Sequence, residues 1–383
     1  TGAPCLESVN EILAGTLAGA YSAKIDGVAS VDERPEFLNC LKIIRAGEVL
    51  PDIVFMNGRD LSSKKNFNEA LLNASRIAYK GQDHHLTYII EKIVKLSKLE
   101  VIRQIDRFGY DEKSKAFIFK QLAVDKDGVI HKPNTLGFFE ALGIKAPSNY
   151  NKSAVMTKFP QVDMGWYVDN MWEAYGAKGF AVLGYYVATY FSHIHFNERG
   201  YHPFLSVVGP RGGGKSGLIL KLNEAFTFIR SEGIGFTKAN TGKGLVRAMA
   251  DRVNLPICFL EGNKQERLNM DEQEFLTLYN RNSSQTTAMR TMDLSTRSIP
   301  FDAGIILAQM REVFKDAGVK QRFITINFPE RNSVFSEKEK TSFLRLMDKT
   351  LCDVGVQVLQ KRQAFEKEWS AEFENWSKLI ASK

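Results

Sequence analysis

Cysteine is scarce in this sequence, and the few residues present are far apart. The four are Cys5, Cys40, Cys258 and Cys352, and no two of them form a Cys-x-x-Cys pair. Disulfide-stapled secreted domains and zinc ribbons both need closely spaced cysteines, so the sequence disfavours both classes. The histidines at 84–85 and 193–202 lack Cys or acidic partners at metal-ligand spacing, and we expect them to be surface or core residues.

Long hydrophobic runs are also missing. No stretch reaches the roughly 18 uninterrupted apolar residues that a membrane-spanning helix requires, and no signal peptide precedes the first segment. We therefore expect no membrane association and a reducing, cytoplasmic setting. Because the first residue is Thr1 and not Met, we interpret the sequence as a piece of a longer protein.

Neither sign of charge dominates the composition. With 51 Lys and Arg against 44 Asp and Glu, the net charge is +7, a mild excess that permits a polyanionic partner without requiring one. The 383 residues are 44% hydrophobic, 25% charged and 11% aromatic, which is ordinary globular composition and excludes a disordered or fibrous protein. A chain of this length predicts roughly two to three domains.

The first part of the chain, residues 1–150, mixes helical and strand-like patterns. Short apolar runs at 116–119 and 122–124 are followed by the turn Asp127-Gly128, which is typical of a β-hairpin or meander. We expect an α+β N-terminal region that ends at a loose boundary near residue 150.

The rest of the chain divides into three further regions. Residues 151–200 predict a helical lead-in, because residues 181–194 are nearly all apolar or aromatic and fit a buried helix. For its aromatic residues Tyr185, Tyr186, Tyr190 and Phe191 we favour core packing over cofactor stacking. Residues 201–330 alternate strand and helix patterns, which predicts an α/β domain with a mainly parallel sheet. Residues 331–383 predict a helical C-terminal tail.

The sharpest motif is Gly209-Pro210-Arg211-Gly212-Gly213-Gly214-Lys215-Ser216, which fits GxxxxGK[ST]. An apolar strand at 204–208 precedes it and a helical segment opened by Gly217 follows, as a P-loop requires. Backbone N–H groups of such a loop face phosphate oxygens at a helix N-terminus. We therefore predict ATP and Mg²⁺ as cofactors, bound by residues 209–217, with Lys215 at the β- and γ-phosphates and Ser216 on the metal.

Three polar residues at strand ends complete the predicted site. Glu261 follows the apolar strand 255–260, and we expect it to serve the metal, the attacking water or both. Gln309 ends the apolar strand 303–308, where a sensor of the nucleotide would lie. Arg322 precedes a third apolar run, where a ring ATPase would present an arginine to its neighbour's γ-phosphate; a surface salt bridge is the alternative for Arg322.

The order of these motifs resembles the helicase part of phage and mobile-element primase-helicases. The resemblance lies in the P-loop, the run from Asn254 to Gly262, the segments Phe275…Asn280-Arg281 and Pro300-Phe301, the strand ending at Gln309, and Arg322. It implies a superfamily 3-like (AAA+) P-loop ATPase that forms a homo-oligomeric ring, a hexamer, on single-stranded DNA. It also implies a toprim-type primase module upstream in the same polypeptide, or a replication partner. The chain departs from the family pattern at Met310, where Asn is usual.

The predicted DNA contact is the segment between the helix that ends near Arg281 and the strand that ends at Gln309. It is rich in Thr, has Asp293 as a turn former and carries Arg290 and Arg297, and we interpret it as a β-hairpin pairing residues 286–292 with residues 294–299. In superfamily 3 rings such a hairpin points into the pore, and the resemblance implies the same here, with Arg290 the stronger and Arg297 the weaker phosphate contact. A solvated surface hairpin is the alternative.

Three functions share the predicted nucleotide site. The favoured one is an ATP-driven, ring-forming DNA helicase. The second is a P-loop ATPase that acts as a switch or loader on a protein partner. The third, a small-molecule kinase, is the weakest, because no short arginine-rich lid follows the P-loop.

Overall fold

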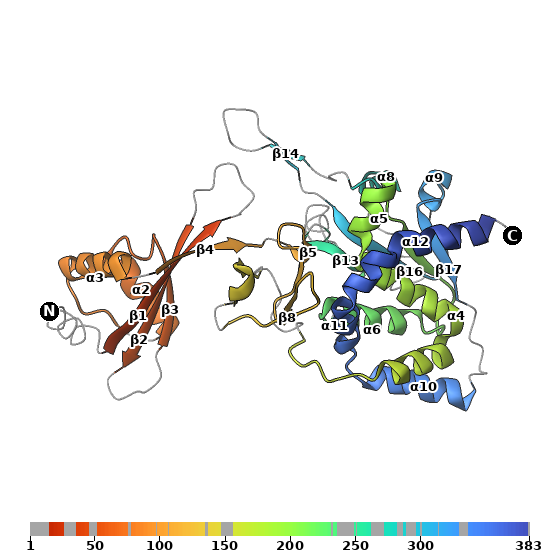
Figure 1. Ribbon diagram of the computed structural model, residues 1–383, viewed down its shortest axis with the longest axis horizontal. Helices are drawn as coiled ribbons and strands as arrows, with labels where there is room; N and C mark the ends of the chain where they lie inside the picture. Colours follow the sequence, from red (N-terminus) through yellow and green to blue (C-terminus); the bar gives the residue numbers. More distant parts are fainter. Residues whose placement is uncertain are drawn as a thin grey trace. The chain divides into compact units, whose positions relative to one another are not determined.

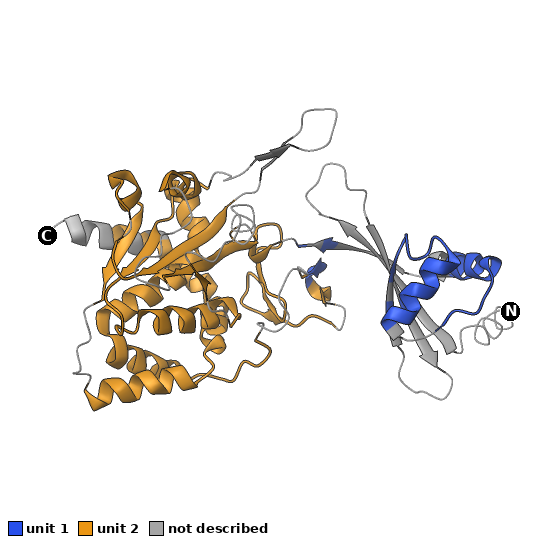
Figure 2. Cartoon of the chain, turned by 180° about the vertical axis from the view of Figure 1, so that it is seen from behind, with its two compact units in different colours: residues 1–105, 142–145 blue, residues 106–141, 146–383 orange. Residues whose placement is uncertain are grey.

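A computed structural model gives the structure of the chain. It describes residues 15–26, 36–45, 52–75, 78–96, 98–105, 107–134, 137–146, 156–230, 233–235, 249, 251–261, 272–281, 286–288, 296–298, 301–312, 314–328 and 336–381. The chain forms two compact units (Figure 2): unit 1 comprises residues 1–105 and 142–145, and unit 2 comprises residues 106–141 and 146–383. No helix in the described part of the chain has the length and apolar character needed to cross a bilayer.

Unit 1 is a sheet with two helices. Its elements are β1 (Gly15–Asp26), β2 (Glu36–Arg45), β3 (Asp52–Asn57), α2 (Lys64–Ser75), α3 (Asp83–Leu96), β4 (Lys98–Gln104) and β10 (Ile144–Lys145). The strand order is β3-β2-β1-β4-β10, with β1, β2 and β3 antiparallel and β4 parallel to β1. Phe67 and Leu71 of α2 and Leu86 and Ile89 of α3 are buried in one cluster, because residues three or four apart lie on one face of a helix.

Unit 2 contains most of the helices and a larger sheet. Its strands are β5 (Phe108–Asp111), β6 (Ala116–Ile118), β7 (Ala123–Val124), β8 (Ile130–His131), β9 (Phe138–Phe139), β11 (Phe204–Val208), β12 (Ile234–Gly235), β13 (Arg252–Leu260), β14 (Thr286–Ala288), β15 (Thr296–Ser298), β16 (Asp302–Gln309) and β17 (Phe323–Asn327). Its helices are α4 (Met164–Tyr190), α5 (Ser192–Arg199), α6 (Lys215–Thr227), α8 (Glu272–Tyr279), α9 (Ala317–Lys320), α10 (Glu337–Asp348), α11 (Cys352–Gln360) and α12 (Arg362–Ala381).

The main sheet of unit 2 is parallel on one side and antiparallel on the other. Its order is β17-β11-β16-β13-β5-β6-β7-β8, with β12 also paired to β13. Strands β17, β11, β16 and β13 run parallel, as the alternating strand and helix pattern of residues 201–330 predicted. Strand β5 also pairs in parallel with β13, and β5 to β8 form an antiparallel meander. The meander predicted near residues 116–131 therefore extends the sheet of unit 2. The boundary expected near residue 150 remains a prediction based on composition.

Two apolar layers cover the faces of this sheet. Successive residues of β16 alternate between them, so that Ile306 packs with α4, α6 and α11 while Ile305 and Leu307 pack with α8 and α9. Figure 1 shows these two groups of helices on opposite sides of the sheet. The hydroxyls of Tyr185 and Tyr186 donate to backbone carbonyls inside the first layer, which confirms core packing for the aromatic residues of α4.

Arg362 ties the C-terminal helix α12 to the meander. Its side chain is only 2% exposed, and its Nη1 donates to the carbonyl of Lys115, at 2.7 Å. Its Nε and Nη2 form a fork on Glu366 Oε1, at 2.8 and 2.6 Å, and the guanidinium lies over the rings of Tyr110 and Phe117. The helical tail and the meander are therefore parts of one packed body.

Candidate nucleotide site

The glycine-rich loop joins the C-terminal end of β11 to the first turn of α6. Gly209 has φ +152°, and a Cβ on it would lie 2.3 Å from the carbonyl oxygen of Phe328, so only glycine fits there. Gly214 precedes α6 in the left-handed conformation, with φ 77°, which few residues other than glycine adopt. The loop therefore turns tightly and leaves the N–H groups of the first turn of α6 available for an anion.

Lys215 is the first residue of α6, and its amine lies over the loop. The side chain is 7% exposed, and Nζ donates to the carbonyls of Gly209 and Pro210, each at 2.6 Å. Burial lowers the pKa of the Lys215 ammonium, and the carboxylate of Glu261 opposes that shift. The positive charge is thus held within the loop where phosphate oxygens would bind.

Glu261 lies directly after β13 and beside the end of β16. Its N–H donates to the carbonyl of Ala308, at 3.0 Å, and its Oε2 accepts from the N–H of Met310, at 2.5 Å. The backbone of Met310 therefore orients the Glu261 carboxylate, although sequence reasoning treated Met310 only as a departure from the family pattern. A backbone contact of this kind leaves no signal in the residue type.

Gln309, the last residue of β16, lies at the same edge of the sheet. Its carbonyl accepts from the N–H of Gly209, at 3.1 Å, and its side chain is 1% exposed. The amide Nε2 donates to Ser206 Oγ at 2.8 Å, whereas Oε1 is buried without a hydrogen-bond partner among the described residues. Ser206 is not among the predicted site residues, and its signal in the sequence is a single hydroxyl inside the apolar strand β11.

One pocket of about 300 Å³ brings most of the predicted site together. Its lining comprises Arg211, Gly212, Gly213, Gly214, Lys215, Ser216, Gly217, Glu261, Ala308, Gln309 and Met310. Gly209 and Pro210 lie beside it as the acceptors of the Lys215 amine. The size is at the lower end for ligand pockets, which run from about 300 to 1,000 Å³, and suits the phosphate end of a nucleotide.

The residues of this pocket fit ATP and Mg²⁺. A left-handed glycine before a helix N-terminus, the Lys215 ammonium and backbone N–H groups suit a polyphosphate. The Ser216 hydroxyl and the Glu261 carboxylate are oxygen ligands of the kind Mg²⁺ uses beside phosphate oxygens. The roles of the individual residues remain predictions.

Arg322 lies at the other edge of the sheet from this pocket. It immediately precedes β17, which runs parallel to β11 with Phe323 opposite Phe204 and Asn327 opposite Val208. Five residues of strand, roughly 16 Å, therefore separate Arg322 from the P-loop edge. Its Nη1 donates to the carbonyl of Gly318, and its guanidinium lies 5.3 Å from the ring centroid of Tyr279.

The predicted DNA hairpin is present in its described part. Strands β14 and β15 pair antiparallel, with Thr287 opposite Arg297, which confirms the pairing expected from the sequence. Arg290 lies outside the described residues, and of Arg297 only the backbone is described. The DNA contacts assigned to both arginines remain predictions.

An ion cluster lies where the chain enters and leaves this hairpin segment. Asp302, at the start of β16, pairs with Arg107 at 2.6 Å and with Arg281 at 3.8 Å. Arg281 also donates to Ser192 Oγ and lies over the ring of Phe196. The two ends of the hairpin segment are thereby fixed to each other and to the strand that ends at Gln309.

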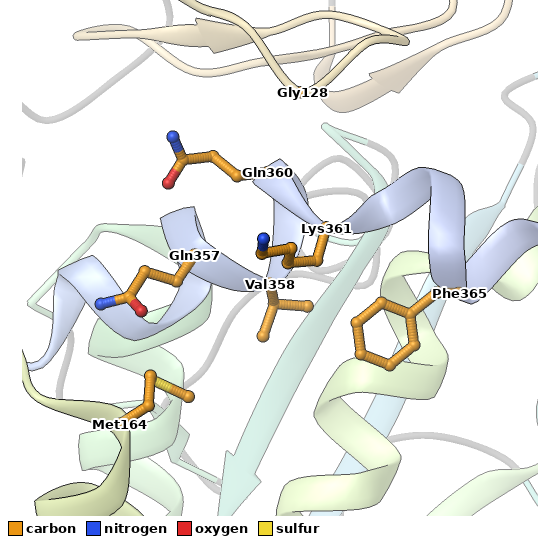
Figure 3. A pocket seen from close by; sticks show the side chains of 7 residues that line it. All are labelled: Gly128, Met164, Gln357, Val358, Gln360, Lys361 and Phe365. Carbon is orange, nitrogen blue, oxygen red and sulfur yellow. The ribbon is translucent and has the colours of Figure 1, made fainter.

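A second cavity, of about 500 Å³, lies between the β7–β8 turn and the junction of α11 and α12 (Figure 3). Its lining comprises Gly128, Met164, Gln357, Val358, Gln360, Lys361 and Phe365. This lining contains no acidic residue and no glycine-rich loop at a helix N-terminus, so it has neither metal ligands nor a phosphate cradle. The nucleotide chemistry therefore points to the P-loop pocket.

Comparison with known proteins gives structural similarity alone. No protein-family model matches the sequence, and no curated protein matches it significantly. The structure is similar to the solved structure described as "SCCmec type IV Cch - active helicase", with a TM-score of 0.55 and 12% identity over 96% of this chain. The fold is that of a helicase-like P-loop ATPase. The chain spans 65% of the length of that helicase chain.

Two further solved structures match with lower scores. An apo form of the NrS-1 C-terminal region matches with a TM-score of 0.32 and 11% identity, covering 84% of this chain and 66% of that one. A JCV helicase with a bound small molecule also matches with a TM-score of 0.32, at 12% identity, covering 55% of this chain and 62% of that one. At these TM-scores the two structures add no argument about the fold.

Proposed function

We propose that this chain is the motor of a DNA helicase from a phage or mobile-element replication protein. The observation that carries the proposal is the P-loop pocket, where Lys215 and Ser216 from one helix N-terminus meet Glu261 and Gln309 from two neighbouring strand ends. In this proposal ATP hydrolysis in the pocket drives movement along single-stranded DNA.

The pocket residues divide the hydrolytic work. Bound Mg²⁺ supplies charge neutralisation for the phosphates. Lys215 would pair with the β- and γ-phosphates, and Ser216 and Glu261 would hold the metal. The Glu261 carboxylate, oriented by the Met310 N–H, also orients the attacking water. Gln309 faces the γ-phosphate end, because it terminates the strand beside the P-loop strand.

The ring and the DNA grip follow from two positions outside the pocket. Arg322 lies at the far edge of its own sheet, so a role at a γ-phosphate requires a nucleotide held by a neighbouring subunit. This supports a homo-oligomeric ring, which we propose to be a hexamer. The β14–β15 hairpin, with Arg290 and Arg297, grips single-stranded DNA, and a primase module upstream or a replication partner completes the machine.

The deciding experiment measures ATP hydrolysis with and without single-stranded DNA, on a sample whose mass is measured by light scattering. A helicase motor should hydrolyse ATP several-fold faster with DNA and form a particle of several subunits. ATP hydrolysis by a monomer that ignores DNA would overturn the helicase and favour a switch or loader acting on a protein. Absence of nucleotide binding would overturn both.

A further inference from the structure

Ser206 is a hydroxyl in the middle of a buried apolar strand. It is 1% exposed, and because strand positions alternate between the two faces, it shares the face of Phe204 in the second apolar layer, opposite Leu205 and Val207. A hydroxyl in such surroundings is costly unless it is hydrogen-bonded. Its partner is the amide Nε2 of Gln309, at 2.8 Å, so this polar pair is built into the sheet directly behind the P-loop.

The other amide atom of Gln309 has no such partner. Oε1 is buried and unsatisfied among the described residues, on a side chain that lines the nucleotide pocket. A buried acceptor without a donor destabilises the fold, so a ligand that supplies a donor would relieve this cost. Phosphate oxygens only accept hydrogen bonds, and they cannot satisfy Oε1.

We propose that Ser206 is a positioning residue that fixes the Gln309 amide, so that Oε1 accepts a hydrogen bond from the water that attacks the γ-phosphate. The inference rests on the proposed ATP hydrolysis and assigns a task within it. Ser206 takes one of the two Nε2 hydrogens, and Oε1 has no donor among the described residues, so Oε1 is the acceptor left for the pocket. The Ser206–Gln309 pair therefore orients the attacking water and does not contribute to nucleotide affinity, which comes from the P-loop.

The test compares Ser206→Ala with Ser206→Thr, which keeps a hydroxyl. Binding of fluorescent ADP and of a non-hydrolysable ATP analogue is measured beside kcat and KM. Ser206→Ala should lower kcat between about 10- and 100-fold, the scale that follows from misplacing a reacting group. Both dissociation constants should stay within about twofold of the wild type, and Ser206→Thr should recover most of the rate.

Two controls separate positioning from loss of structure. Thr189→Val removes another buried hydroxyl, whose donor bond to the carbonyl of Tyr185 is also 2.8 Å, and it should leave kcat unchanged. The double variant Ser206→Ala/Gln309→Ala should be no slower than Gln309→Ala alone, because the two residues act as one unit.

Each failure has its own signature. If Ser206→Ala keeps the wild-type kcat, the positioning role is wrong while the proposed function stands. If the variant binds the ATP analogue several-fold more weakly but ADP normally, the amide donates to the γ-phosphate, and the water-facing orientation is wrong. If the wild-type protein binds neither nucleotide, the proposed function itself fails.

Discussion

Replacing Arg362 by alanine should destabilise unit 2, because this buried guanidinium joins α12 to the meander. Its bond to the Lys115 carbonyl is a charged hydrogen bond worth about 1.5–3 kcal/mol. Glu366 is 30% exposed, so the ion pair adds only about 1 kcal/mol. The contacts with the two rings add about 0.5–1 kcal/mol each. Together these contributions give an expected loss in the free energy of unfolding of about 3.5–6 kcal/mol.

Denaturant unfolding followed by tryptophan fluorescence measures this loss. Trp369 lies on the same helix, and its ring centroid is 6.5 Å from that of Phe191. Its fluorescence therefore reports on the affected region. The matched control is Lys338→Ala, which breaks the pair with Glu173 at 2.7 Å, where the lysine is 76% exposed. That variant should lose less than about 1 kcal/mol. If both variants lost the same free energy of unfolding, burial of the charged side chain would not be what determines the size of the loss.

Four further predictions concern ATP hydrolysis, DNA binding and pH. Lys215→Ala should abolish ATP hydrolysis and leave folding intact, since it removes charge from the transferring phosphoryl group, commonly worth several kcal/mol; wild-type turnover would contradict the P-loop assignment. Mixing Lys215→Ala with Arg322→Ala protein should restore some hydrolysis, and no rescue in a sample shown to mix subunits would return Arg322 to a structural role. Arg290→Ala should weaken single-stranded DNA binding and flatten its log–log salt dependence by about 0.7; an unchanged slope would exclude Arg290 as a phosphate contact. Burial lowers the pKa of His202 to about 3. Below about pH 6.5 the unfolded chain therefore binds a proton at this histidine, whereas the folded chain stays unprotonated there until about pH 3. Stability should therefore fall between pH 6.5 and 3, and His202→Phe should flatten that fall in pH-dependent thermal unfolding, whereas an unchanged profile would exclude His202 as its source.

The nucleotide pocket was predictable because its parts are local in sequence. The P-loop is one continuous motif, and Glu261 and Gln309 each follow an apolar strand whose carboxyl end meets the loop once the strands run parallel. Ser206 was not predictable, because a serine in an apolar strand gives no indication of its partner on another strand.

The position of the meander could not be predicted for a different reason. Its strands were visible as short apolar runs, but their place in the sheet depends on β5 pairing with residues Arg252 and Val253. That stretch of β13 has a register shift between Val253 and Pro256, with Asn254 at a positive φ of 55°. Pairing between segments so distant in sequence is set by tertiary packing and not by local pattern.

The sheet that carries the nucleotide pocket includes β5 to β8, so unit 2 begins well before the P-loop, and it is not a single uninterrupted length of polypeptide. Residues 106–141 and 146–383 form unit 2, while the four residues between them belong to unit 1. A gene fragment that begins near residue 150 would encode every pocket residue and still leave the β5-pairing part of β13 without its neighbour. An exposed, unpaired strand edge invites association with other chains. A recombination event that moved unit 2 intact into another protein would therefore need its breakpoint upstream of residue 106, and residues 142–145 of unit 1 would be transferred with it.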